Sequence, residues 1–199
     1  YVCSTIALGA NTDPYQPVEK RLQITRQILT TLLAWKHPVA IVTKGALVLR
    51  DIDLLAELAS HGLVSVGISL TTLDNTLKTT LEPRAAGPAA RLRCVRELTA
   101  AGIPVGILMA PVIPGLNDHE IEDIAEAAAA AGARSISYVL LRLPYEVKDL
   151  FRNWLELHYP LKAQHVMSRV NEMRGGRDND PNFGSRMRGS GELAELLRK

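Results

Sequence analysis

The stretch AGIPVGILMAPVIPGLND, residues 101–118, contains the alternation that decides the fold. Gly102 ends a helical pattern and leads almost directly into the apolar run Val105–Val112, which is typical of a helix that ends on a glycine before a strand. A Pro-Gly turn then precedes Asn117 and Asp118. We expect one of these two side chains to cap the next helix.

The same alternation recurs along the chain, because apolar strand-like runs are separated by amphipathic runs of helical period. The predicted strands are residues 4–8, 39–43, 64–70, 105–112 and 136–141. The predicted helices are residues 18–33, 52–59, 89–101, 119–131, 147–158 and 163–173. Strands separated by helices predict a parallel α/β sheet, and so few strands cannot close an eight-stranded barrel. We therefore expect a partial barrel or an open sheet over 1–174, with 175–199 as a C-terminal tail whose short helix packs on the barrel.

Composition narrows the class of protein. The chain has 199 residues, of which 47% are hydrophobic, and a formal net charge of +2, so one core is expected and charge alone argues for neither a nucleic-acid nor a membrane partner. Cys3 and Cys94 lie too far apart to form a ligand pair or a disulfide framework, which favours the reducing cytoplasm. No apolar stretch approaches the length of a membrane span. Because the chain begins at Tyr1 and soon enters an apolar run, we expect that a further strand precedes it.

The loops that follow the predicted strands are longer and more polar than those that precede them. In a parallel sheet the carboxyl ends of the strands share one edge, where binding sites form. An ammonium, guanidiniums, hydroxyls and carboxylates around one mouth suit a zwitterionic ligand. The candidate residues at this edge are Asn11, Thr12, Asp13, Thr43, Lys44, Ser69, Thr71, Thr72, Glu82, Arg84, Asn117, Asp118 and Arg142.

Each of these motifs also has a structural interpretation. Asn11-Thr12-Asp13-Pro14 is typical of a turn with side-chain-to-backbone bonds. Lys44 is compatible with a solvated lysine, and Glu82 with a local ion pair to Arg84. In the tail, Arg177, Arg186 and Arg188 fit either an ordered segment laid over the body or a strip that contacts nucleic-acid phosphates.

Several segments taken together resemble the radical S-adenosylmethionine (SAM) proteins related to spore photoproduct lyase, the DNA repair photolyase-like group. The resemblance extends across essentially the whole chain. It rests on ALGANTDPYQPVE, IVTKGALVLRDIDLLAEL, SLTTLD, LEPRAAGPAARL, AGIPVGILMAPVIPGLND and GGRDNDPNFGSRMRG. The fold that it implies is a partial, six-stranded (β/α) TIM-like barrel.

The resemblance implies two cofactors, SAM and a [4Fe–4S] cluster held by a CxxxCxxC loop. That loop is not in this sequence, so the chain would hold the SAM-binding portion without the metal ligands, and alone it would be inactive. The implied reaction is reductive cleavage of SAM to a 5′-deoxyadenosyl radical, with an electron donor as partner and an unknown substrate for which a nucleic acid is one candidate. Ala10 stands where the lyase has a hydrogen-donating cysteine, which argues against photoproduct repair itself.

Residue roles also follow from the resemblance. Thr12 and Asp13, beside Asn11, would lie near the SAM amino group, while Lys44, with Ser69 beside it, would meet the methionyl carboxylate. The remaining implied contacts are Glu82 and Arg84 near the carboxylate or ribose, and the backbone of Val112 and Ile113 against adenine.

Two alternatives of other kinds remain open at this stage. One is an aldolase-type barrel in which Lys44 forms a Schiff base. The other is a non-catalytic nucleic-acid-binding module that uses the arginines of the tail.

Overall fold

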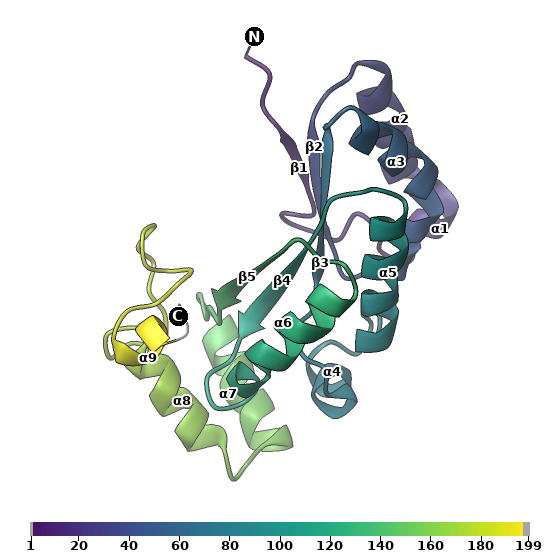
Figure 1. Ribbon diagram of the computed structural model, residues 1–199. Helices are drawn as coiled ribbons and strands as arrows, with labels where there is room; N and C mark the ends of the chain where they lie inside the picture. Colours follow the sequence, from purple (N-terminus) through teal and green to yellow (C-terminus); the bar gives the residue numbers. More distant parts are fainter. Residues whose placement is uncertain (1, 197–199) are drawn as a thin grey trace. The chain divides into compact units, whose positions relative to one another are not determined.

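The computed structural model describes residues 2–196, without the side chains of 193 and 196. One parallel sheet runs through it in the order β1-β2-β3-β4-β5 (Figure 1). The strands are β1 Ile6–Leu8, β2 Val39–Thr43, β3 Val64–Ser69, β4 Val105–Val112 and β5 Ser135–Leu140. The predicted α/β class and its parallel strands are confirmed.

The helices fill the intervals between the strands. They are α1 Glu19–Leu22, α2 Ile24–Ala34, α3 Ile52–Ser60, α4 Asn75–Leu81, α5 Pro88–Ala100, α6 Ile121–Ala130, α7 Val147–His158, α8 Ala163–Glu172 and α9 Glu192–Leu196. Two short 3-10 turns, Ala46–Asp51 and Asp118–Glu120, precede α3 and α6. No helix in the described range is long and apolar enough to cross a membrane.

The chain folds into two compact units. Unit 1 comprises 1–108 and 123–137, and unit 2 comprises 109–122 and 138–199. The predicted division into a barrel over 1–174 and a tail over 175–199 places its boundary elsewhere than these units do, and it stays a prediction.

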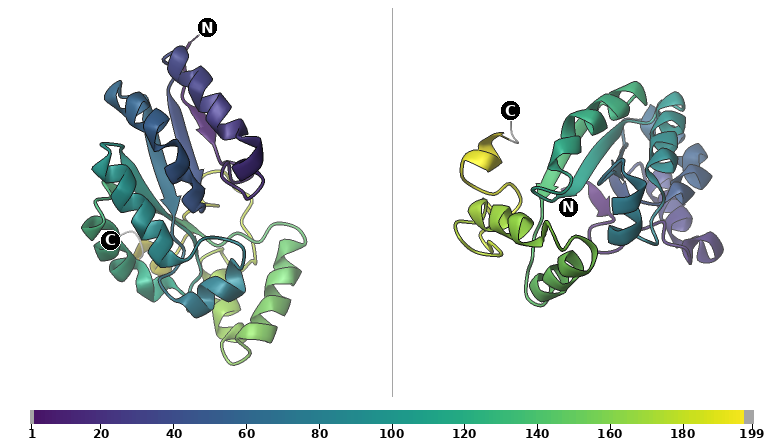
Figure 2. Two further views of the ribbon diagram at one scale, coloured as in Figure 1. Left: turned by 90° about the vertical axis from the view of Figure 1, so that its right-hand side faces the viewer. Right: turned by 90° about the horizontal axis from the view of Figure 1, so that it is seen from below.

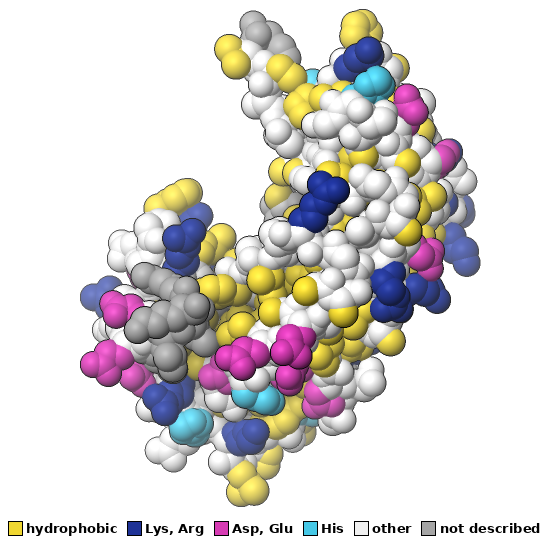
Figure 3. Space-filling view, viewed as in Figure 1, with side chains coloured by type: hydrophobic (Ala, Val, Ile, Leu, Met, Phe, Trp, Pro, Cys, Tyr) yellow, Lys and Arg dark blue, Asp and Glu magenta, His cyan; other side chains and the backbone are white. Residues whose placement is uncertain are grey.

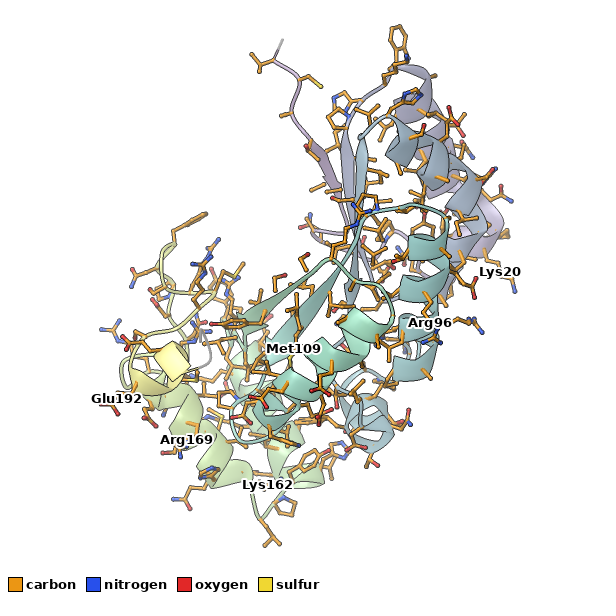
Figure 4. All side chains as sticks on the ribbon, viewed as in Figure 1. Lys20, Arg96, Met109, Lys162, Arg169 and Glu192 are labelled. Atoms are coloured by element: carbon orange, nitrogen blue, oxygen red, sulfur yellow. The ribbon has the colours of Figure 1, made fainter. Side chains whose placement is uncertain are left out.

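Unit 1 is built on the paired strands β1, β2 and β3, with α2, α3 and α5 on one face (Figures 1 and 2). Every second residue of β2 is buried, and Val66 and Ile68 of β3 are 1% exposed. In α5 the buried positions Arg91, Cys94, Val95 and Leu98 recur at helical spacing, which turns one stripe of the helix toward the core. Arg96 lies on the opposite side of α5 and projects away from the sheet (Figure 4). Lys20 of α1 also projects away from the sheet in this view.

The predicted helix over 18–33 is two helices, and its break has a local cause. Gln23 adopts a left-handed conformation with φ 53°. The Glu19 carboxylate accepts hydrogen bonds from the backbone N–H groups of Ile24 and Thr25, each at 3.0 Å. The amides in the first turn of a helix have no partner within the helix, and here the Glu19 carboxylate accepts from two of them. A new helix, α2, therefore begins at Ile24.

The interval between the predicted strand over 64–70 and the predicted helix over 89–101 contains a further helix, α4, that the sequence pattern did not reveal. Asp74 caps α4, because its carboxylate accepts from the backbone N–H of Thr76 at 2.7 Å and of Leu77 at 3.3 Å. Of the helix residues only Leu77 is buried. One buried residue gives no periodic signal, which is why this helix was missed.

Candidate cofactor site at the carboxyl ends of the unit 1 strands

Asp13 joins the loop after β1 to the end of β2. Its Oδ1 accepts from the Tyr15 backbone N–H at 2.8 Å and from the Thr43 hydroxyl at 2.6 Å. Its Oδ2 accepts from the Lys44 backbone N–H at 2.7 Å. The bond to Tyr15 is the turn that the sequence allows, and the other two draw neighbouring strand ends together. Asp13 therefore closes a turn and also positions Lys44.

Gly45 makes this close approach possible. A Cβ at Gly45 would lie 2.9 Å from the carbonyl oxygen of Tyr15 and 3.1 Å from its Cβ. Any side chain would therefore push the loop after β1 away from the end of β2. Thr43 completes the junction, because its hydroxyl accepts from the Gly45 backbone N–H at 2.9 Å.

Glu82 is the centre of a buried charge cluster. Its Oε1 accepts from the Lys44 ammonium and, at 3.1 Å, from the Thr71 hydroxyl, and its Oε2 accepts from the Arg91 guanidinium at 2.6 Å. The side chains of Glu82 and Arg91 are 9% and 2% exposed, whereas that of Lys44 is 37% exposed. Burial acts to raise the pKa of Glu82, but the charges of Arg91 and Lys44 outweigh it and lower that pKa. Glu82 is thus an anion that holds Lys44.

Arg91 anchors the cluster to the sheet, and the sequence analysis did not single it out. Its guanidinium donates to the carbonyl oxygens of Ser69 and Ala86, both at 2.8 Å. The signal was present in the sequence, because Arg91 occupies the apolar stripe of α5 three, four and seven residues before its buried neighbours. The predicted alternative of a local pair between Glu82 and Arg84 is not what the structure has, since Glu82 pairs with Lys44 and Arg91.

Ser69 brings an unsatisfied hydroxyl to the same place. It ends β3 and is 2% exposed, and its Oγ has no hydrogen-bond partner within the described residues. A buried polar atom without a partner costs about 1–3 kcal/mol. Because the carbonyl oxygen of the same residue accepts from Arg91, such an atom fits a site that a polar ligand completes.

A cleft of about 660 Å³ opens beside this cluster. Asp13, Lys44 and Arg84 line it together with Lys20, and Ala46 and Leu47 are among its apolar lining residues. The volume lies in the usual range for small-molecule sites. The structure therefore brings three of the predicted residues to one cleft. Asn11 and Thr12 lie in the loop after β1 and are exposed.

One side of the cleft is stiffened by an ionic network behind it. Arg50 donates to the Glu19 carboxylate at 2.9 Å and to Asp51 at 2.7 Å, and its guanidinium lies 5.9 Å from the ring centre of Tyr15. Burial, followed by the charge of Asp51, raises the pKa of Tyr15. Tyr15 lines the cleft and stays a neutral phenol near neutral pH, so it supplies shape rather than charge.

Val112 and Ile113, the predicted adenine contacts, belong to unit 2, and both are fully buried. The Ile113 N–H donates to Asn117 Oδ1 at 2.6 Å, and the Val112 carbonyl accepts from the Leu141 N–H at 2.9 Å. A ligand would therefore find carbonyl lone pairs here rather than a free Ile113 N–H.

The expected capping role of Asn117 or Asp118 is wrong. Asn117 also donates to the Pro111 carbonyl at 3.1 Å, and Asp118 accepts from the Gly115 N–H at 2.9 Å. No side-chain cap bond forms at Asn117. Both side chains reach back into their own loop, because the turn at Gly115 brings its backbone within their range.

Metal ligands do not assemble within the described part of the chain, where no three His, Cys, Asp or Glu side chains form a metal-binding group. Cys3 is exposed and Cys94 is buried in α5.

The tail arginines differ in exposure. Arg177 and Arg188 are exposed, whereas Arg186 is half-buried and stacks over Phe183.

The chain belongs to the Radical SAM superfamily, which it matches over residues 2–128. An uncharacterized protein of Mycobacterium bovis is 35% identical over 198 residues, which are 98% of this chain and 56% of that protein. An uncharacterized protein of Methanocaldococcus jannaschii is 29% identical over 170 residues, which are 85% of this chain and 62% of that protein. The chain thus spans little more than half the length of these relatives.

Solved structures show the same fold at low sequence identity. Spore photoproduct lyase complexed with dinucleoside spore photoproduct superposes with a TM-score of 0.61 and 16% identity, over 79% of this chain and 46% of that one. Streptococcus suis SuiB bound to S-adenosylmethionine gives a TM-score of 0.53 and 16% identity, over 81% and 37% of the two chains. The five-stranded sheet with its helices is accordingly a partial TIM-like barrel of the radical SAM type.

Proposed function

We propose that this chain is the SAM-binding portion of a radical SAM enzyme. The observation that carries the proposal is the cluster of Lys44, Glu82 and Arg91 at the carboxyl ends of the strands, in a member of this superfamily. Ser69, whose carbonyl binds Arg91, adds an unsatisfied hydroxyl. These charged and polar side chains suit SAM, which is a zwitterionic ligand. A lysine ammonium has three donors, so Lys44 can keep Glu82 and still bind a ligand carboxylate.

The roles of the other residues follow from their remaining capacity. A carboxylate offers about four acceptor positions, and Asp13 already accepts three bonds. One position is left for the SAM ammonium, with the exposed Asn11 and Thr12 nearby in sequence. Arg84, from the cleft wall, and the anchored Glu82 would approach the carboxylate or ribose. Val112 and Ile113 would contact adenine through their backbone.

When bound, SAM and a [4Fe–4S] cluster supply reductive cleavage of SAM and a 5′-deoxyadenosyl radical. The chain's own residues bind SAM, orient it and exclude water. We place the metal ligands in a segment outside this chain and the protein in the cytoplasm, with an electron donor as partner. A nucleic acid is the proposed substrate class, because spore photoproduct lyase shares this fold. We propose a reaction other than photoproduct repair, since the resemblance puts Ala10 where the lyase has its hydrogen donor.

Direct binding of SAM tests the proposal. In equilibrium dialysis with labelled SAM, Lys44→Ala and Asp13→Ala should each weaken binding at least about tenfold, as expected for loss of a charge-assisted bond. Lys148→Ala, which removes the same side chain from α7 in unit 2, is the control and should bind as the parent does. Unchanged binding in Lys44→Ala with a native circular dichroism spectrum would refute the site.

The reaction is tested in the longest natural form of the protein, reconstituted anaerobically with iron and sulfide and reduced with dithionite. Release of 5′-deoxyadenosine is expected. If neither an iron–sulfur cluster nor SAM binding can be detected, the proposal fails.

The exposure of Lys44 and its ion pair with Glu82 disfavour the aldolase alternative. A Schiff-base lysine has to be a neutral amine in a dry pocket, whereas Lys44 is partly exposed and paired with a carboxylate. Borohydride with a carbonyl substrate should therefore leave no adduct on it.

A further inference from the structure

Unit 2 contains a buried arginine that has no carboxylate partner among the described residues. Arg174 is 5% exposed. Its guanidinium donates to the carbonyl oxygens of Leu140 and Leu141 at 3.3 and 2.7 Å, and to those of Ser185 and Arg186 at 3.4 and 2.7 Å. Arg174 thereby holds the tail segment 177–189 against the end of β5.

The backbone makes the same junction. The Leu140 N–H donates to the Met187 carbonyl oxygen at 2.9 Å. A Cβ at Gly189, whose φ is 70°, would lie 2.7 Å from Leu140 Cδ1 and 3.0 Å from the Met173 carbonyl oxygen. Only a glycine allows the tail to lie this close to the strand. The position of the tail beside Leu140 is thus set by several independent contacts.

This junction brings positive charge together. Arg142 lies two residues after the end of β5, and its guanidinium approaches the Met187 sulfur at 4.0 Å. Arg186 precedes that methionine in the chain. The Nε atoms of Arg142 and Arg186 are both buried and lack a partner in the described part of the chain. Arg142 is thus next to Met187 in space, and Arg186 is next to it in the chain.

The acidic side chains of the tail are engaged elsewhere and do not pair with these arginines. Asp178 binds Arg152 at 2.9 Å. Asp180 accepts from the Ser185 hydroxyl and, at 2.9 Å, from the Asn182 N–H, and its charge acts on the buried Arg174. Within the residues described, Arg142 and Arg186 have no carboxylate in ion-pair range.

An exposed aromatic ring stands beside these charges. Phe183 is 85% exposed, and the Arg186 guanidinium lies over one face of its ring, 3.8 Å from the centroid. The opposite face is left to solvent. Figure 3 shows Lys and Arg side chains next to hydrophobic ones over this segment. A ring backed by a guanidinium is a suitable platform for a nucleobase.

We propose that Phe183, Arg186 and Arg142 form a subsite for an unpaired nucleotide of a nucleic-acid strand. The base stacks on the free face of Phe183, and the adjoining phosphodiester binds the two guanidiniums. The choice of a nucleic acid rests on the proposed function, but the subsite itself rests on unit 2 alone. Arg177 and Arg188, which are exposed in the same segment, add attraction for the backbone without fixing the base.

Fluorescence anisotropy with a labelled single-stranded oligothymidine and the full chain tests the subsite. Phe183→Ala should weaken binding about tenfold, the effect of losing one stacked base, while Phe183→Trp should preserve it. Arg186→Gln and Arg142→Gln should each weaken binding and lower the slope of log K against log salt by about one.

Two matched controls distinguish binding at the subsite from non-specific electrostatic binding and from non-specific hydrophobic binding. Arg169→Gln removes an exposed arginine of α8 that pairs with Glu172 (Figure 4). Leu161→Ala removes an apolar side chain that is 99% exposed. Neither should change binding of the oligonucleotide.

The proposal is overturned if Phe183→Ala binds as tightly as the parent, or if Arg169→Gln loses as much affinity as Arg186→Gln. It is also overturned if the parent binds no oligonucleotide at low salt. Labelled SAM is measured on the same variants. Strand binding that is unchanged in Phe183→Ala, or absent in the parent, would refute this subsite, and intact SAM binding in the same proteins would leave the proposed function standing.

Discussion

Each unit of this protein buries an arginine, and only one of the two has a carboxylate partner among the described residues. Arg91 of unit 1 forms an ion pair with Glu82, which Lys44 completes. Arg174 of unit 2 binds only carbonyl oxygens among its described hydrogen-bond partners. Burial lowers the pKa of Arg174, which reflects the cost of a charge without a counter-ion.

The difference indicates what each unit can recognise. In unit 1 the opposite charges already hold one another, so Lys44 is held in place before the proposed zwitterionic ligand binds. In unit 2 the positive charge stays in excess, which favours an anionic strand. The following predictions test this contrast.

The largest effect is expected from Arg91→Met, because it leaves the Glu82 carboxylate buried with only Lys44 and Thr71. Removing one partner of a buried pair costs about 3–5 kcal/mol of unfolding free energy. Urea denaturation measures it, with Arg93→Met as control, since Arg93 lies on the same helix with its side chain 57% exposed. Adding Glu82→Gln to Arg91→Met should recover part of the loss, and a further loss would contradict the orphaned-charge explanation.

A smaller effect is expected from Arg174→Met. The substitution leaves carbonyl oxygens unsatisfied but strands no charge, and it removes a costly buried cation, so about 2 kcal/mol should be lost. Hydrogen exchange should show faster exchange at the Leu140 amide, which donates to Met187. If Arg174→Met costs more than Arg91→Met, the contrast between the two arginines is wrong.

The acid dependence of stability should be carried by unit 1. The folded-state pKa of Glu82 lies below the usual 4.5, so its contribution is full above that value and is lost as pH falls through the folded pKa. Glu82→Gln should flatten the fall of unfolding free energy between about pH 5 and about pH 3. Asp51, whose pKa is lowered by Arg50 and Arg26 against the effect of burial, should keep some slope. An unchanged slope would exclude Glu82 as a contributor.

The smallest effect is expected at the surface pair of Arg26 and Asp53. The hydrogen bond from Arg26 lowers the pKa of Asp53 to about 2, yet the Asp53 side chain is 58% exposed. Water and salt screen such a pair. Asp53→Asn should shift the urea midpoint slightly at low salt and not at high salt, and a shift that persists at high salt would show that the pair is not screened.

The strands could be predicted almost to the residue, whereas two features of the helices could not. Alternating apolar runs and C-terminal glycines mark buried parallel strands in any context. The break at Gln23 depends on the Glu19 carboxylate reaching the next helix, and α4 buries too little to leave a pattern. Both depend on contacts rather than on periodicity.

The candidate site was predicted in part. Asp13, Lys44 and Arg84 do line one cleft, because strand ends of a parallel sheet must share an edge. The partner that anchors Glu82 was missed, since Arg91 lies on a helix and not at a strand end. The expected cap at Asn117 failed because a nearby loop amide competed for the same side chain.

By itself the sequence determined the order of strands and helices, the edge that carries the polar loops and the resemblance to radical SAM proteins. Those features follow from local periodicity, from turn residues and from motifs that are continuous in the chain. Only the tertiary structure decided which charges meet. Two partners of Glu82 lie 38 and 9 residues away from it in the chain. Arg174 binds one residue 34 positions before it and another 12 positions after it. Such pairings depend on which side chains share a buried space, and no local pattern encodes that.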